Sequence, residues 1–204
     1  METVLVGGAS GNIGVSVIIA ALRSGRRVLA IVRNNAAEQK IIQHVGTKDR
    51  ITFVEAQVTY ENSVQKVVDR VKAGELPDFQ HVVGKMETTH PTQNLKIYPN
   101  ATWTLVTGSL GALGFAGVTA ISQGALFSLA SVACLENLKT NVRFNEVYLG
   151  YRDSVFAHVY EAILANQSIR GCRITVSSPE DVHQLKYKRK LPDYDYDSLF
   201  AEYM

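Results

Sequence analysis

The chain has 204 residues, of which 46% are hydrophobic and 20% are charged, and its formal net charge is +2 at pH 7. This length and composition are typical of one globular domain. The small net charge and the absence of a basic stripe with interleaved aromatic residues argue against a nucleic-acid-binding protein. The two cysteines, Cys134 and Cys172, have neither metal-ligand nor disulfide spacing, so we expect buried thiols in a reducing compartment and no metal site.

The chain begins directly with a predicted strand and shows no basic leader, which favours a cytoplasmic protein. The long apolar stretch from Gly108 to Leu135 is interrupted by Ser, Thr, Gln and Gly residues. We therefore do not expect this stretch to span a membrane.

Strand-like and helix-like segments alternate along most of the chain. The predicted strands are Thr3–Val6, Arg27–Val32, Ile51–Ala56, Gln80–Val83, Thr102–Val106, Asn141–Val147 and Cys172–Val176. The predicted helices are Gly14–Ser24, Ala36–Val45, Ser63–Ala73, Thr119–Asn137 and Ser154–Asn166. This alternation predicts a doubly wound, mostly parallel α/β sheet of the Rossmann-like class, in a single domain over residues 1–185. Residues 186–204 are first basic and then acidic and tyrosine-rich, and we expect a tail that is solvated, docked on the surface or bound to a partner.

A glycine-rich turn joins the first predicted strand to the first predicted helix. In this setting one glycine makes the tight turn, one lets the backbone approach a pyrophosphate, and one lets helix and strand pack closely. The anion would lie on the unpaired N–H groups at the positive end of the helix. The residues that we predict to bind dinucleotide phosphates are Gly8, Ser10, Gly11, Asn12, Ile13 and Gly14.

The residue that follows the second predicted strand distinguishes between the two nicotinamide dinucleotides. NAD-binding proteins usually have a carboxylate there, which accepts from the ribose 2′-hydroxyl and would repel a 2′-phosphate. This chain has Arg33, which would form charge-assisted hydrogen bonds with a 2′-phosphate. The sequence therefore favours NADP(H) over NAD(H), with an exposed arginine that binds no ligand as the alternative.

From the glycine turn to Val176 the chain resembles the short-chain dehydrogenase/reductase family. The segments that carry the resemblance are Gly8–Gly14, Gln57–Val64, Val106–Ser109, Ala120–Leu126, Asn141–Gly150 and Ile169–Val176. The resemblance implies that Gln57 lies beside the adenine, that Gly150 belongs to the turn that covers the nicotinamide, and that Ser109 is the catalytic serine.

The chain departs from this family where the chemistry is expected. The family's proton-donating tyrosine and the lysine four residues later are replaced by Thr119 and Gln123. A threonine hydroxyl is too weak an acid to replace a phenol near neutral pH, and glutamine carries no charge that could tune it. The segment between the fourth and fifth predicted strands is also too short for the family's long helix and its asparagine. An ordinary reductase mechanism is therefore not expected.

Other residues could supply the missing chemistry. Tyr148 and Tyr151, which we place on the turn over the nicotinamide, are candidate proton donors, and Lys85 and His90 are candidate charge stabilisers. Each of these residues also fits an ordinary packing or surface role. An iminium substrate would need no proton donor, so we expect an NADP(H)-dependent reductase of a small carbonyl or imine metabolite with an altered mechanism.

Two alternatives belong to other functional classes. One is a non-redox cyclase, isomerase or dehydratase on the same fold, as occurs among the family's secondary-metabolism members. The other is a non-catalytic scaffold subunit. The helix Thr119–Asn137 is rich in small residues and corresponds to the family's dimer helix, so we expect a homodimer, although packing within one chain explains this composition equally well.

Overall fold

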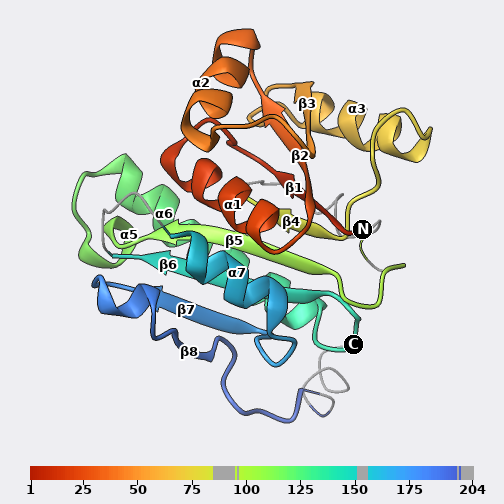
Figure 1. Cartoon of the computed structure of the whole chain (residues 1–204). Coiled ribbons are helices and arrows are strands. Elements are labelled where there is room, and N and C mark those ends of the chain that lie inside the picture. Colours follow the sequence, from red (N-terminus) through yellow and green to blue (C-terminus); the bar gives the residue numbers. More distant parts are fainter. Residues whose placement is uncertain (85–94, 96, 151–155, 197, 199–204) are drawn as a thin grey trace.

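The computed structural model describes residues 1–84, 95, 97–150, 156–196 and 198 (Figure 1). The strands are β1 (Thr3–Val6), β2 (Arg27–Val32), β3 (Ile51–Glu55), β4 (His81–Val83), β5 (Thr102–Gly108), β6 (Arg143–Leu149), β7 (Cys172–Val176) and β8 (Lys186–Arg189). The helices are α1 (Asn12–Arg23), α2 (Asn35–Val45), α3 (Glu61–Lys72), α5 (Leu110–Leu113), α6 (Val118–Glu136), α7 (Ala157–Ala165) and the short 3₁₀ helix η1 (Glu180–Val182). Each predicted strand and helix is present, with small shifts of its ends. The sequence analysis did not predict α5, η1 or β8.

The strands form one eight-stranded sheet in the order β3-β2-β1-β4-β5-β6-β7-β8. The pairs from β3 to β7 are parallel, and β8 pairs antiparallel with β7. The prediction of a doubly wound, mostly parallel sheet is therefore confirmed. The sheet also takes in Lys186–Arg189, which the sequence analysis had assigned to the tail.

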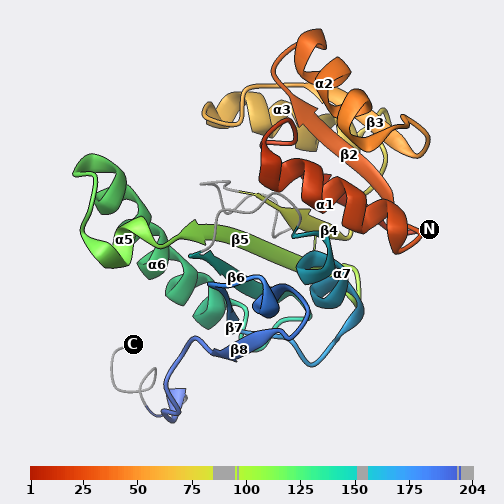
Figure 2. The ribbon, with the colours of Figure 1, turned by 60° about the vertical axis from the view of Figure 1, so that its left-hand side comes forward.

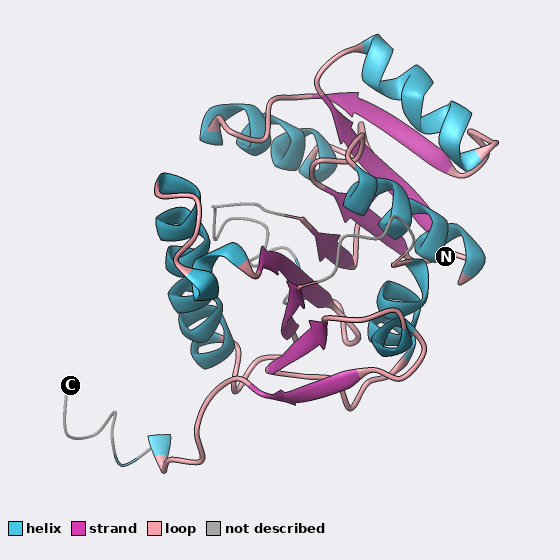
Figure 3. Ribbon diagram, turned by 90° about the vertical axis from the view of Figure 1, so that its left-hand side faces the viewer, coloured by secondary structure: helices cyan, strands magenta, loops and turns pink. Residues whose placement is uncertain are grey.

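Helices cover both faces of the sheet, as Figures 2 and 3 show from two directions. On one face, α1, α2 and α7 pack with residues such as Val4, Val6 and Ile174 in the first hydrophobic cluster. On the other face, α3 and α6 pack with residues such as Leu5 and Trp103 in the second cluster. Because successive strand residues point to opposite faces, the apolar runs of these strands supply both clusters.

The second face stays closed at β4 and β5, where a shortened connection could have exposed the strands. Val82, Trp103 and Leu105 are at most 2% exposed. Leu95, from the connection between β4 and β5, is fully buried in the same cluster, and Tyr98 packs against it. The described part of this connection therefore still contributes apolar side chains to the core.

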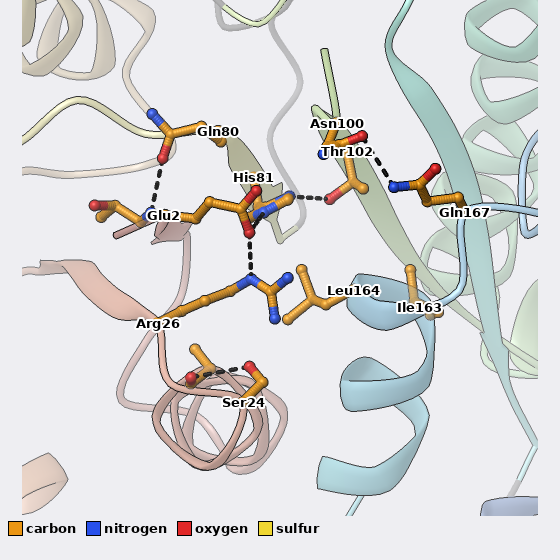
Figure 4. A network of polar contacts seen from close by, with 12 residues as sticks. Glu2, Ser24, Arg26, Gln80, His81, Asn100, Thr102, Ile163, Leu164 and Gln167 are labelled. Atoms are coloured by element: carbon orange, nitrogen blue, oxygen red, sulfur yellow. Dashed lines mark hydrogen bonds and ion pairs between the residues drawn. The ribbon is translucent and has the colours of Figure 1, made fainter. Parts of the chain in front are cut away.

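A polar network joins β1, β2, β4 and β5, the four strands at the centre of the sheet, at their amino ends (Figure 4). The Glu2 carboxylate accepts a hydrogen bond from Arg26 Nε at 2.9 Å and one from His81 Nε2 at 3.1 Å. His81 Nδ1 lies 3.0 Å from Thr102 Oγ1. Burial lowers the pKa of His81 to about 4, so its imidazole is neutral at pH 7, with Nε2 donating and Nδ1 accepting. The network lies at the edge opposite to the carboxyl ends of the strands.

Among the described helices, α6 has the length and composition that would allow it to cross a membrane. It packs against β5 and β6 within the sheet's second layer, as an ordinary helix of this fold does. Length and composition alone therefore do not make it a membrane span.

Candidate functional site

The turn between β1 and α1 is shaped by glycines. Gly8 has a φ of +71°, a conformation that side chains disfavour, and the Gly11 N–H donates to the Gly8 carbonyl at 3.1 Å. A Cβ atom at Gly14 would lie 2.4 Å from the Gly8 oxygen and 2.6 Å from Ala9 Cα. Position 14 therefore has to be a glycine, because α1 rests directly on the turn that precedes it.

The amino end of α1 is open to an anion. Its N-cap is Gly11, without a side-chain cap hydrogen bond, and its first turn contains no acidic residue. Gly11, Asn12 and Ile13 are exposed, and Ser10 beside them is half-buried. The first N–H groups of a helix have no intrahelical acceptor and lie at its positive end. The residues present thus fit a phosphate or pyrophosphate group.

Gly84, directly after β4, completes this turn and was not among the predicted site residues. Its φ is +153°, and a Cβ atom there would lie 2.9 Å from the Gly7 oxygen. The Gly7 N–H donates to the Val83 carbonyl at 3.0 Å. The end of β4 is therefore packed against the glycine turn between β1 and α1. A glycine directly after a buried strand was the sequence signal for this position.

Arg33 and Gln57 follow the carboxyl ends of β2 and β3. These strands are parallel neighbours, with Val32 opposite Glu55, so both residues lie at the same edge of the sheet as the glycine turn. Arg33 and Gln57 are both exposed. Within the described residues no carboxylate forms an ion pair with Arg33, so its guanidinium group can bind an anion.

Ser109 and Gln123 come together at the carboxyl end of β5. The Ser109 N–H donates to the Leu149 carbonyl at 3.0 Å, and the Gly108 N–H donates to Gln123 Oε1 at 2.8 Å. Thr119, in the first turn of α6, is exposed. The structure thus places Thr119 and Gln123 on the same helix, with Gln123 bonded to the residue that precedes the predicted catalytic serine.

The placement of Tyr148 differs from the expectation. We predicted that Tyr148 lies on the turn after the sixth strand, but β6 continues through Leu149 because it stays paired with β5 up to Gly108 and with β7 up to Val176. The ring of Tyr148 packs 5.8 Å from the ring of Phe127 on α6. Tyr151, Lys85 and His90, the other candidates for altered chemistry, lie outside the described residues.

Gly150 directly follows β6, as the predicted nicotinamide turn requires. Its N–H donates to the Val176 carbonyl at 2.8 Å, and a Cβ atom there would lie 3.0 Å from Ser177 Oγ. The close approach of the two segments explains a small residue at this position.

A buried charge cluster lies on the α6 face of β5, β6 and β7. The Glu146 carboxylate is 0% exposed and receives hydrogen bonds from Thr107 Oγ1 at 2.8 Å and from Arg173 Nε at 2.9 Å. Lys190 Nζ, just after β8, lies 2.7 Å from the same carboxylate. The Arg173 guanidinium also lies over the Phe127 ring, 4.8 Å from its centroid. The cluster ties β8 to the sheet. No local sequence pattern predicts it, because Thr107, Glu146, Arg173 and Lys190 come from four separate segments.

Comparison with known proteins identifies the family. A short-chain dehydrogenase/reductase, iacG of Pestalotiopsis fici, is 41% identical over 239 aligned positions, which cover 93% of this chain and 96% of that protein. This chain belongs to the short-chain dehydrogenase/reductase family. The family model for short chain dehydrogenases matches residues 2–86, which include the glycine turn. The 239 aligned positions exceed the 204 residues of this chain, so iacG contains segments that this chain lacks.

Solved structures of low sequence identity share the fold. A short-chain dehydrogenase/reductase from Mycobacterium marinum is 17% identical with a TM-score of 0.70, over 86% of this chain and 93% of that one. An NADPH-bound short chain oxidoreductase from Pseudomonas aeruginosa PAO1, described as containing an atypical catalytic center, is 16% identical with a TM-score of 0.62. The alignment of the two structures covers 79% of this chain and 76% of the P. aeruginosa chain. The Rossmann-like fold of the family is thus shown for this chain as well.

Proposed function

We propose that this protein binds NADP(H) at the glycine turn and reduces a small carbonyl or imine metabolite without the family's tyrosine and lysine. The observation that carries this proposal is the open amino end of α1, on a turn that admits only glycine at position 14. Arg33 lies at the same edge of the sheet and forms no ion pair with any residue that the structure describes. The relative iacG is a member of the same family. The NADPH-bound oxidoreductase from P. aeruginosa offers a precedent for an atypical catalytic center on this fold.

Each half of the cofactor would be held by a different part of the edge. The first N–H groups of α1 bind the pyrophosphate, and Arg33 pairs with the 2′-phosphate. Gln57 would lie near the adenine and Gly150 near the nicotinamide, as the resemblance to the family implies. The bound nicotinamide supplies the hydride.

The residues at the end of β5 would orient the substrate. The Ser109 hydroxyl would donate a hydrogen bond to a carbonyl oxygen or accept one from the N–H of a protonated imine, while the hydrogen bonds of Ser109 to β6 and of Gly108 to α6 hold this residue in place. Thr119 remains protonated at neutral pH and delivers no proton. A protonated imine needs none, which makes imines the substrate class that agrees best with this site.

Nucleotide titration of the wild-type protein and of Arg33→Ala tests the proposal. We expect NADPH to bind more tightly than NADH, and Arg33→Ala to weaken NADPH binding by about tenfold to a hundredfold with little effect on NADH, because one charge-assisted contact is lost. Nicotinamide fluorescence or calorimetry measures both affinities. Arg27→Ala is the matched control, since Arg27 is an exposed arginine at the opposite end of the same strand.

The other outcomes have definite meanings. If neither nucleotide binds, the reductase proposal is wrong, and a scaffold subunit becomes the better hypothesis. If substrate turns over without nucleotide, the protein is a non-redox cyclase, isomerase or dehydratase.

We propose that the protein is cytoplasmic and that it forms a homodimer through the surface of α5 and α6. Leu113, Phe115, Val118 and Ile121 are 70%, 71%, 80% and 73% exposed, and Val132 further along α6 is 51% exposed. The sequence has no charged residue from position 97 to position 135. An uncharged surface with large apolar side chains favours protein association, and we propose that a second copy of this chain covers it.

Sedimentation measures this association. We expect a dimer at micromolar concentration and a shift towards monomer for Ile121→Lys, since the lysine would place a charge in the interface. A wild-type monomer at these concentrations would contradict the proposal.

A further inference from the structure

The end of β5 extends beyond the end of β4. Strand β4 ends at Val83, which pairs with Thr104. The N–H of Thr102 points to the β4 side, where it donates to Gln80, and the N–H of Ser109 points to β6, where it donates to Leu149. Because successive N–H groups of a strand alternate in direction, the N–H of Gly108 points to the β4 side, past the last residue of β4. A backbone donor at this place needs an acceptor from elsewhere.

Gln123 supplies that acceptor. Its Oε1 atom lies 2.8 Å from the Gly108 nitrogen, and its side chain is half-buried between α6 and the end of β5. Helix α5 closes over it, since a Cβ atom at Gly111 would lie 2.7 Å from the Gly124 nitrogen and 2.9 Å from Gln123 Cβ. The backbone of Gly111 thus lies directly against α6 and keeps Gln123 in place.

The family's lysine could not form this contact. A lysine ammonium group only donates hydrogen bonds, so it would leave the Gly108 N–H unpaired and would bring two donors together. The carboxamide of glutamine accepts through Oε1 and keeps two N–H donors for a ligand. The exchange of lysine for glutamine therefore changes what this position does, beyond the loss of a charge.

We propose that Gln123 is a positioning residue that fixes the end of β5, and with it Ser109, at the nicotinamide end of the site. It acts through a neutral hydrogen bond to the Gly108 N–H, a contact that the lysine expected at this position in the family could not form. The hydrogen bond itself needs no cofactor, whereas the role at the nicotinamide end rests on the NADP(H) proposal above.

Amide hydrogen exchange in the nucleotide-free protein tests the hydrogen bond. We expect the Gly108 amide to exchange about tenfold faster or more in Gln123→Lys and Gln123→Met, which lack a carbonyl acceptor. Gln123→Glu keeps an acceptor of the same length and should keep the protection. Unchanged protection of Gly108 in both the lysine and the methionine variant would overturn the proposal.

Two ligands separate the nicotinamide end from the rest of the site. Adenosine 2′,5′-bisphosphate carries the 2′-phosphate but no nicotinamide, and we expect Gln123→Met to change its affinity by less than about twofold. The same variant should weaken NADPH binding by about tenfold and reduce the change in nicotinamide emission. An equal loss for both ligands would show a general structural effect and would overturn the role at the nicotinamide end.

This design also separates the two proposals. If the wild-type protein binds neither ligand, the NADP(H) proposal fails. The exchange of the Gly108 amide still decides whether Gln123 holds the end of β5.

Discussion

The two halves of the sheet's carboxyl edge are built in different ways. Around β1, β4 and α1 the main chain shapes the candidate site: Gly14 and Gly84 allow backbone segments to approach one another more closely than a Cβ atom permits. Around β5, β6 and α6 side chains determine the arrangement, through the contact of Gln123 with Gly108 and the cluster at Glu146.

This difference explains how one half can keep its function while the other changes. A phosphate site made of N–H groups is part of the fold, so losing it disturbs the packing of α1 on β1. A catalytic pair made of side chains can be replaced without a change in the backbone. Thr119 and Gln123 occupy regular positions of α6 although neither can do the chemistry of a tyrosine and a lysine.

Removal of the buried Glu146 carboxylate, in the half around β5, β6 and α6, should cause the largest loss of stability. Glu146→Gln leaves Arg173 and Lys190 close together without a counter-charge, and we expect the free energy of unfolding to fall by about 3–5 kcal/mol. Urea denaturation measures this change. The exposed pair of Glu75 with Arg70 offers the control, since Glu75→Gln should cost less than about 1 kcal/mol. Equal effects of the two substitutions would show that the cluster contributes no more than a surface ion pair.

Replacement of Gly14 by alanine adds a methyl group to the glycine turn and tests the half around β1, β4 and α1. In Gly14→Ala the new Cβ atom would lie within 2.7 Å of three backbone atoms of Gly8 and Ala9, so we expect a loss of about 3 kcal/mol and no measurable NADPH binding. Gly124→Ala on α6 is the matched control, because no atom lies within 4 Å of its Cβ position. There we expect a gain of about 0.5–1 kcal/mol from helix propensity. If Gly14→Ala binds NADPH normally, the turn does not depend on glycine.

A fall in pH should weaken the polar network of Glu2, Arg26, His81 and Thr102, which joins the two halves at the amino ends of the strands. The pKa of His81 is lowered to about 4 by burial, against the ordinary value of 6.5 that applies to the unfolded chain. Between these two values the unfolded chain binds the extra proton, so stability falls as the pH falls from about 6.5 to 4, by about 3 kcal/mol for this group.

Denaturation curves at several pH values measure this loss. His81→Gln should reduce the pH dependence in this window. The same pH dependence in wild type and His81→Gln would place the acid-sensitive group elsewhere.

The smallest effect is expected at Thr119. The side chain of Thr119 is exposed, so Thr119→Ala should change the free energy of unfolding by less than about 0.5 kcal/mol. NADPH binding should change by less than about twofold, as fluorescence titration would show. A larger loss of affinity would bring Thr119 into the cofactor site and would weaken the contrast between the two halves.

The amino-acid sequence determined the order of the strands and helices, the doubly wound class and the glycine turn between β1 and α1. Apolar periodicity and glycine spacing act over a few residues, so they can be identified without the partners that pack on them. Arg33 and Gln57 lie at the carboxyl edge of the sheet, each directly after a predicted strand. Their roles in binding stay predictions.

The tertiary structure decided what depends on distant segments. It placed Lys186–Arg189 in the sheet through antiparallel pairing with β7, and it placed Tyr148 inside β6, because pairing with neighbouring strands sets where a strand ends. It also brought Gln123 to Gly108. Hydrogen bonds and buried charges of this kind join residues far apart in the chain, and residue types alone do not specify which of them meet.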